Sequence, residues 1–331
     1  MLSNHTSDPI ESQLREEALY KPYQSLNAYL KKKYGEKIYK IALDGGFTCP
    51  NRDGTCGTRG CIFCSAGGSG EFATAIRQNS SIDAQITQAL ARFGNKQTGQ
   101  RFIAYFQAYT GTYAAPERLY ALYHMALSHP KIIGISIATR PDCLPAPVLD
   151  VIKQCQMEFP DKFVWIELGL QSVHEKTALY IRRGYPLSCF EGALETLQTM
   201  SVPVIVHVIL GLPGETRADM LATIDYLSHK NIFGIKLQLL HVLRGTDLAA
   251  EYERGVFSCL SKEAYIDLLC SCIDHLNPAI ILHRVTGDGP KDLLVAPTWS
   301  LQKRDVLNSL HKALKAGGHY QGKDFGNHRP L

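Results

Sequence analysis

The 331-residue sequence lacks an apolar run close to the roughly 20 residues that a membrane-spanning helix needs. Its N-terminus, MLSNHTSDPIESQLREE, is polar and lacks the apolar stretch of a secretory signal. A strong excess of one charge is missing too. The net charge of +4 is too small to establish a nucleic-acid partner and does not exclude one. We therefore expect a cytoplasmic protein with no membrane partner.

Cysteine, in contrast, is plentiful, with ten residues. A cytoplasmic compartment keeps thiols reduced, so a disulfide framework is a poor explanation for them. Metal binding, catalysis and simple burial remain, and the spacing of the cysteines has to distinguish among these explanations. Cys259, Cys270 and Cys272 lie in helical, partly apolar segments. There we expect small buried hydrophobic side chains, with a second metal site as the alternative.

Apolar stretches alternate with amphipathic helical patterns along most of the chain. The stretches that predict strands are residues 38–43, 102–107, 132–138, 164–170, 204–210 and 235–240. The helical patterns cover residues 25–34, 81–93, 116–127, 145–157, 187–200 and 216–227. Strands separated by helices indicate right-handed βαβ units and a parallel sheet. Continuous apolar strands such as IIGISIA fit burial on both faces.

The expected fold is an α/β protein built as an incomplete (β/α)6 barrel with a C-terminal α/β extension. A closed eightfold barrel would need two more units. The chain instead continues with helices near 247–252 and 262–276, a strand at 280–284 and a helix at 301–315. We divide the chain into a flexible N-terminus at 1–18, a core barrel at 19–245 and an extension packed on the barrel at 246–331. A doubly wound open sheet is the alternative fold.

The loop after the first predicted strand is long, rich in glycine and cysteine, and poor in helical pattern. It spans residues 44–72 and contains Cys49, Cys56, Cys61 and Cys64. Loops of this length are usually functional or disordered, and this one follows a strand at the end where barrel folds place their chemistry. Four thiolates can close around zinc. Three thiolates that hold an iron–sulfur cluster leave one iron open to a cofactor. The strand–loop–helix context and the aromatic Phe63 inside the C-x2-C pair favour the cluster.

The segment LDGGFTCPNRDGTCGTRGCIFCSAGGSGEF resembles the signature of radical S-adenosylmethionine (SAM) enzymes of the YhcC/YtqA-type group, which is similar to the elongator-type radical SAM proteins. Further blocks that look like the family are AYFQAYTGTYA, GISIATRPDCL, WIELGLQSVHEKT, HVILGLPGET, KLQLLHVLRGT, HRVTGDGP and WSLQKRDVLN. The resemblance implies a radical-SAM-type barrel in which Cys49, Cys61 and Cys64 hold a [4Fe–4S] cluster and Cys56 is a bystander. It also implies that the open iron binds SAM and that reductive cleavage of SAM yields a 5′-deoxyadenosyl radical.

The resemblance and the positions near the carboxyl ends of strands together make eight residues candidates for the SAM site. They are Gln107, Tyr109, Arg140, Glu167, Gln171, Ser172, His207 and Leu210, the last through its backbone. Structural roles compete with this assignment. Arg140 could instead form an ion pair with Asp142 or Glu167. Ser172 could cap a helix, and His207 could be a hydrogen-bonded core residue. Strand alternation puts Glu167 on a buried face, which is costly unless its carboxylate is paired or functional.

The resemblance further implies an enzyme with particular partners. We expect an electron donor of the flavodoxin or ferredoxin type. One branch of the family is linked to maturation of a modified wobble uridine in tRNA, which makes tRNA the leading substrate class. The alternatives are a radical SAM enzyme that acts on a small metabolite and a non-catalytic zinc-binding protein that uses the four loop cysteines.

Overall fold

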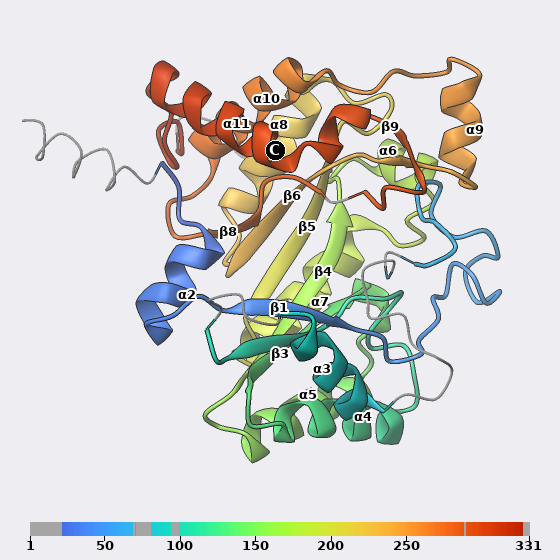
Figure 1. Ribbon diagram of the computed structural model, residues 1–331. Helices are drawn as coiled ribbons and strands as arrows, with labels where there is room; N and C mark the ends of the chain where they lie inside the picture. The colour runs from blue at the N-terminus through green and yellow to red at the C-terminus, as the bar shows by residue number, and fades with distance from the viewer. Residues whose placement is uncertain (1–21, 69, 71–80, 94–98, 288, 327–331) are drawn as a thin grey trace, which may run out of the picture.

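A curled, parallel sheet of seven strands forms the centre of the computed structural model, which describes residues 22–68, 70, 81–93, 99–287 and 289–326 (Figure 1). In sheet order the strands are β1 (Tyr39–Leu43), β2 (Phe102–Phe106), β3 (Ile132–Thr139), β4 (Phe163–Gln171), β5 (Val204–Leu210), β6 (Gly234–Leu239) and β8 (Ile281–Arg284). All neighbouring pairs are parallel. The predicted flexible N-terminus at 1–18 lies outside the described residues.

Helices flank the sheet, with α3, α4 and α5 on one side of the view and α8, α10 and α11 on the other (Figure 1). The helices that the sequence predicts are α2 (Leu26–Tyr34), α3 (Ile82–Ala91), α4 (Pro116–Ser128), α5 (Ala146–Glu158), α7 (Leu187–Thr199), α8 (Arg217–Ser228), α9 (Asp247–Glu253), α10 (Lys262–His275) and α11 (Lys303–Gly317). The structure adds α6 (Glu175–Tyr180) and two short 3₁₀ turns, Pro141–Cys143 and Thr298–Leu301.

Capping side chains explain why several helices begin where they do. The Ser81 side chain accepts a hydrogen bond from the backbone N–H of Ala84 at the start of α3. Thr216 and Asp219 form a reciprocal capping box at the start of α8. Pro116 occupies the first turn of α4, where its missing N–H costs nothing. These local signals fix the helix starts within a residue or two of their predicted positions.

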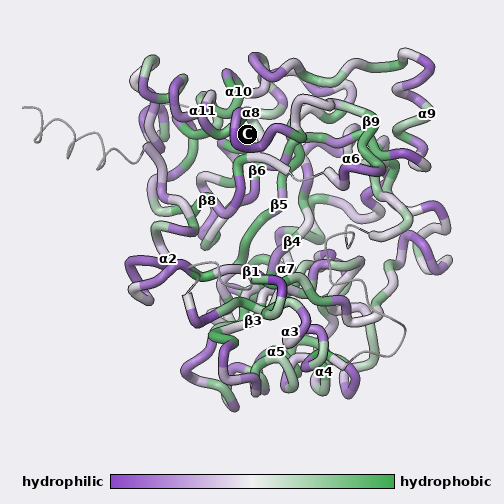
Figure 2. The backbone as a smooth tube through the Cα atoms, viewed as in Figure 1, coloured by the Kyte–Doolittle hydropathy of each residue, from purple (hydrophilic) through white to green (hydrophobic). Residues whose placement is uncertain are grey.

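The outer face of the sheet packs its apolar side chains against these helices. Strand β2 is buried along its whole length, and β5 is buried at every position except His207. Figure 2 shows this as hydrophobic colour along the central strands, with hydrophilic colour concentrated on the helices and loops around them. Such two-sided burial is expected of parallel strands that are covered by crossover helices.

The incomplete barrel with a C-terminal extension is confirmed, and the extension contributes to the barrel sheet. The strand predicted near residue 280 becomes β8 and pairs in parallel with β6, so it forms the seventh strand. A separate two-stranded antiparallel ladder joins β7 (Val242–Leu243) to β9 (Leu294–Ala296). No helix in the described ranges is long and apolar enough to cross a membrane.

Candidate active site

The three predicted cluster ligands line one cavity at the carboxyl ends of the strands. Cys49, Cys61 and Cys64 share the walls of this cavity of about 170 Å³, which we call the cluster cavity. Cys56 is exposed and lines a different cavity, beside Pro50. The fold therefore brings together the three thiols that the resemblance selects and sets the fourth apart.

The C-x2-C segment is fixed to the rest of the protein through Ile62. Its backbone N–H donates to the carbonyl of Ile181 (3.1 Å), and its carbonyl accepts from the N–H of Leu248 (3.0 Å). The Ile62 side chain is 4% exposed and belongs to a small apolar cluster with Leu212 and Leu248. Burial of this side chain holds Cys61 and Cys64 in place although the described residues of the surrounding loop form no helix or strand.

Two polar side chains of the loop also hold the cysteine segment. The amide of Asn51 donates to the carbonyl of Arg182 (2.7 Å) and to Sγ of Cys61 (3.4 Å). The guanidinium of Arg52 donates to the carbonyls of Cys64 (2.8 Å) and Ser65 (2.5 Å). Residues that hydrogen-bond a ligand in this way orient it and tune the metal that it binds.

The donor set fits an iron–sulfur cluster, because thiolates are its usual ligands. Burial and the neighbouring Cys64 raise the pKa of the Cys61 thiol to about 12, and a bound metal would favour its thiolate. Within the described ranges, no three His, Cys, Asp or Glu side chains are close enough to surround a single metal ion. The cysteines of a cubane cluster each bind a different iron and need not converge on one point.

Two residues of the predicted SAM site hold unusual backbone conformations beside the cluster cavity. Tyr109 has φ of 57° and Gln171 has φ of 67°, in the left-handed region that non-glycine residues rarely adopt. Both line the cavity together with Gln107. The hydroxyl of Tyr109 donates to the carbonyl of Ala66 (2.5 Å), and its N–H donates to Gly68. Strained residues of this kind cluster at binding and catalytic sites.

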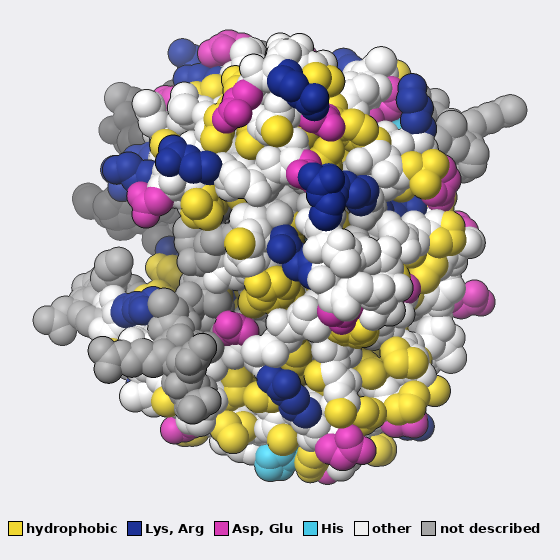
Figure 3. Space-filling view, turned by 90° about the vertical axis from the view of Figure 1, so that its right-hand side faces the viewer, with side chains coloured by type: hydrophobic (Ala, Val, Ile, Leu, Met, Phe, Trp, Pro, Cys, Tyr) yellow, Lys and Arg dark blue, Asp and Glu magenta, His cyan; other side chains and the backbone are white. Residues whose placement is uncertain are grey.

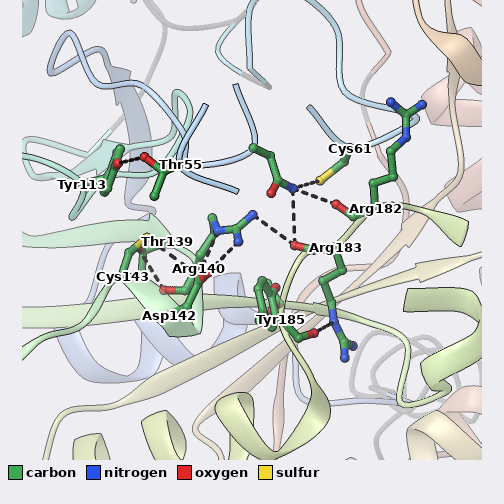
Figure 4. Close-up of polar contacts among 12 residues, drawn as sticks. Thr55, Cys61, Tyr113, Thr139, Arg140, Asp142, Cys143, Arg182, Arg183 and Tyr185 are labelled. Atoms are coloured by element: carbon green, nitrogen blue, oxygen red, sulfur yellow. Dashed lines mark hydrogen bonds and ion pairs between the residues drawn. The ribbon is translucent and has the colours of Figure 1, made fainter. Parts of the chain in front are cut away.

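Arg140 lies on the wall of the same cavity and is held from two sides. Its guanidinium makes a bidentate pair with Asp142 (2.9 and 2.6 Å) and donates to the carbonyl of Arg183 (3.0 Å). It also lies 5.0 Å from the ring centroid of Tyr185 (Figure 4). The ion pair with Asp142 that the sequence left open is therefore present, and it orients the guanidinium at the cavity wall.

Glu167 is fully buried and fully paired. Its first carboxylate oxygen accepts from Lys40 (2.5 Å) and Ser136 (2.6 Å). Its second oxygen accepts from Lys236 and contacts Nε2 of His207 (2.6 Å). These attractive contacts outweigh the effect of burial and hold the pKa of the Glu167 carboxyl well below its usual range. Two ammonium groups thus share one carboxylate in the barrel interior.

The lysine and histidine of this network respond to burial in the opposite direction. Burial lowers the pKa of Lys236 to about 7, although the charge of Glu167 partly offsets the effect. Burial and the charge of Lys236 lower the pKa of His207 to about 4, so its imidazole is neutral at pH 7. His207 and Glu167 both line the cluster cavity. The network therefore forms the floor of the predicted SAM site as well as part of the core.

Ser172 and Leu210 lie apart from this cavity wall. The hydroxyl of Ser172 is buried and donates to Glu215, and it also accepts from the N–H of His174 (3.1 Å). The side chain of Leu210 packs in the main core, and its carbonyl accepts from the N–H of Leu240 (3.0 Å). Their assignment to the SAM site remains a prediction. Cys270 and Cys272 are buried in the main core, and Cys259 is half-buried beside the smaller apolar cluster.

Sequence reasoning missed several polar residues of the barrel interior, namely Lys40, Tyr105, Lys236 and Gln238. The two lysines had a readable signal, because each interrupts an apolar strand, YKIAL in β1 and GIKLQL in β6. A lysine at such a position is costly unless it is paired. Arg284 belongs to the HRVTGDGP block, whose polar side chains and glycines suggested a site wall or substrate contact, and β8 places it beside Lys236 by joining the sheet.

Comparisons with known proteins agree with this geometry. The family model of the radical SAM superfamily matches residues 54–227, and the model of the radical SAM C-terminal domain matches residues 232–316. Cys61 and Cys64 fall within the first match, and Cys49 precedes it. The chain is 42% identical to the uncharacterized protein YtqA of Bacillus subtilis, over 92% of this chain and 93% of that protein. It is 36% identical to protein YhcC of Escherichia coli K12, over 90% and 93%.

Elongator proteins are more distant. Elongator complex protein 3 of Danio rerio is 27% identical over 50% of this chain, which spans only 30% of that protein. The solved structure of the archaeal Methanocaldococcus infernus Elp3 superposes with a TM-score of 0.64 at 14% identity, over 86% of this chain and 64% of that one, and shows the same fold. The resemblance predicted from the sequence is therefore confirmed: the chain belongs to the radical SAM superfamily, whose enzymes use a [4Fe–4S] cluster and SAM.

Proposed function

We propose that Cys49, Cys61 and Cys64 hold the [4Fe–4S] cluster and that SAM binds beside them in the cluster cavity. The observation that carries this proposal is that these three thiols share one cavity, whereas Cys56 lines another. Held there, the cluster would supply the electron for reductive cleavage of SAM to methionine and a 5′-deoxyadenosyl radical. The residues of the cavity bind and orient SAM and exclude water.

Arg140 is well placed to bind the carboxylate of SAM. Its bonds to Asp142 and to the Arg183 carbonyl use three of its five N–H donors, which leaves two for an incoming carboxylate. Because Asp142 already fixes the guanidinium plane, little side-chain entropy is lost on binding. The amides of Gln107 and Gln171, on the same cavity wall, supply donors and acceptors for the remaining polar groups of the cofactor.

Asn51 would act on the cluster through Cys61. Its amide N–H points at the sulfur from 3.4 Å while the same nitrogen is anchored on the carbonyl of Arg182. A hydrogen bond to a ligand sulfur favours the more negatively charged, reduced form of a cluster and so raises its reduction potential. An electron donor of the flavodoxin or ferredoxin class would supply the reducing electron.

We further propose that the substrate is tRNA and that the radical serves maturation of a modified wobble uridine. The likeness to Elongator complex protein 3 over half of the chain supports this substrate class. The mildly basic net charge of +4 is compatible with it. On the face shown in Figure 3, Lys and Arg side chains are interspersed with acidic and apolar ones, so that face has no continuous basic patch among its described residues.

Two experiments test these proposals separately. Anaerobically purified protein should be brown, should contain about four irons, and should release 5′-deoxyadenosine when SAM and dithionite are added. Colourless protein with one tightly held zinc would contradict the cluster. Bulk tRNA from cells with and without the gene should differ in its modified uridines. An unchanged nucleoside profile would contradict the tRNA proposal and leave the radical chemistry standing.

A further inference from the structure

A second cavity, of about 500 Å³, lies where the two edge strands of the curled sheet face each other. Residues of β1, such as Lys40, form one wall, and His283 and Arg284 of β8 form the opposite wall. We call this space the lateral cavity. It shares Tyr105, Gln107, Lys236 and Arg284 with the cluster cavity, so a molecule bound here would lie next to the cofactor site.

Positively charged side chains line the lateral cavity both in its buried interior and at its exposed rim. Lys40 and Lys236 lie deep, with side-chain exposures of 18% and 6%, and both bind the single carboxylate of Glu167. Arg284 lies close enough to lower the pKa of both lysines through its charge. The exposed residues Lys291 and Lys303 also line the cavity. No aspartate or glutamate of the described residues lines it, and Glu167 behind it offsets only one of the two lysine charges, so with Arg284 a net positive charge remains to attract anions.

His283 gives an independent indication that this cavity receives a ligand. Both of its ring nitrogens are buried and lack a hydrogen-bond partner in the structure. Burial holds the pKa of this imidazole well below its usual range, so the ring is neutral and one nitrogen carries an N–H donor. The ring itself is held edge-on by Trp165 (5.5 Å between centroids) and Phe233 (5.6 Å). A buried donor without a partner is rare in native proteins and calls for an acceptor.

We propose that the lateral cavity binds an anionic oxygen group of the substrate, a phosphate or a carboxylate, and holds the adjoining part of the substrate against the cluster cavity. Arg284 and Lys236 supply the charge, and His283 supplies a neutral donor once its ring turns to bring one of its buried, unpartnered nitrogens to the bound anion. SAM's own carboxylate has a separate partner, because Arg140 and the three cysteines line the cluster cavity and lie outside the lateral one. This inference rests on the proposed function, since it identifies the substrate side of the same site.

The test uses the anaerobically purified full chain with its cluster and with saturating SAM, so that the cofactor's carboxylate site is filled. Inorganic phosphate and acetate are titrated separately by calorimetry at constant ionic strength in chloride. The variants are Arg284→Gln and His283→Phe, and each should weaken anion binding at least tenfold. Lys312→Gln removes the same charge from an exposed position on α11 and should bind like the unaltered protein.

The His283→Phe variant separates a binding role from a structural one. Phenylalanine keeps the ring contacts with Trp165 and Phe233 and removes the unpartnered nitrogens, so the thermal midpoint should stay the same or rise. Loss of anion binding without loss of stability is the expected result. A histidine that served only packing would leave anion binding unchanged in this variant.

Each outcome has a defined meaning. Binding of phosphate alone assigns a phosphate-bearing group, binding of acetate alone assigns a carboxylate, and binding of both assigns a shared oxyanion site. The inference is overturned if neither probe binds the unaltered protein, or if both variants bind like it. Release of 5′-deoxyadenosine without substrate is measured in the same preparations. If that release persists while anion binding is absent, this inference fails and the proposed radical function stands.

Discussion

Replacing Glu167 by glutamine tests the buried charge network at the floor of the site. The substitution keeps the shape of the side chain and removes the carboxylate that Lys40 and Lys236 share. The amide N–H groups of the new glutamine would also face the ammonium groups of Lys40 and Lys236, which are hydrogen-bond donors as well. Removal of one partner from a buried ion pair costs about 3–5 kcal/mol, a large part of the roughly 5–15 kcal/mol by which a typical domain is stable.

The loss should depend on pH in a defined direction. Glu167 raises the pKa of Lys236, which is about 7 in the folded protein, so the variant should have a lower value still. An unfolded lysine keeps its proton up to about pH 10.4. Between the pKa of Lys236 in the folded variant and its pKa in the folded unaltered protein, the folded variant binds fewer protons. In that pH range, the free energy of unfolding of the variant therefore rises with pH relative to that of the unaltered protein. The deficit should therefore be larger at pH 6 than at pH 7.

Urea unfolding of the two proteins under anaerobic conditions measures both effects. Trp165, which is 2% exposed and lies 5.6 Å from the ammonium of Lys40, is a fluorescent reporter at the network. With an m-value of about 2–3 kcal/mol per molar urea, the midpoint should fall by about 1–2 M. Glu195→Gln, an exposed position on α7, should stay within about 0.5 kcal/mol. Equal midpoints for Glu167→Gln and the unaltered protein at pH 6 would refute the reasoning.

Three further predictions concern the cavity wall and the core. Asn51→Ala should lower the reduction potential of the cluster, because Cys61 loses a hydrogen-bond donor. A redox titration followed by electron paramagnetic resonance measures this potential, and an unchanged value would contradict the role assigned to Asn51. Arg140→Gln should raise the Kd of SAM at least about tenfold, a loss of about 1.4 kcal/mol, and equal affinity in equilibrium binding would remove Arg140 from the site. Phe190→Ala, at a fully buried position of α7, should cost about 3–5 kcal/mol in urea unfolding, and a loss below 1 kcal/mol would contradict the packing described.

The strands and most helices could be predicted because their signals are local. Apolar runs mark the strands, and capping residues such as Ser81 and Thr216 mark helix starts. Helix α6 was missed because six residues are too few to show a helical period. The pairing of β7 with β9, and of β8 with β6, joins segments about 40 to 50 residues apart, and no local pattern specifies such contacts.

In the candidate site, too, local features could be predicted and long-range contacts could not. Cys49, Cys61 and Cys64 were selected by the resemblance, and the alternation of β4 placed Glu167 on a buried face. Its partners could have been sought among buried lysines, but only the curled sheet shows that Lys40 and Lys236 reach one carboxylate from opposite sides. The HRVTGDGP block suggested a site wall or substrate contact, but the lateral cavity itself exists only where the first and last strands of the sheet approach each other.

The central claim is that three of the four loop cysteines hold the cluster. Single replacements by alanine at Cys49, Cys56, Cys61 and Cys64, purified anaerobically, allow iron content and 5′-deoxyadenosine release to be measured side by side. Cys56→Ala should keep the iron and the activity of the unaltered protein, because Cys56 is exposed and lines a different cavity. Each of the other three replacements should abolish 5′-deoxyadenosine release. Loss of the cluster in Cys56→Ala, or an active enzyme in any of the other three, would contradict the account.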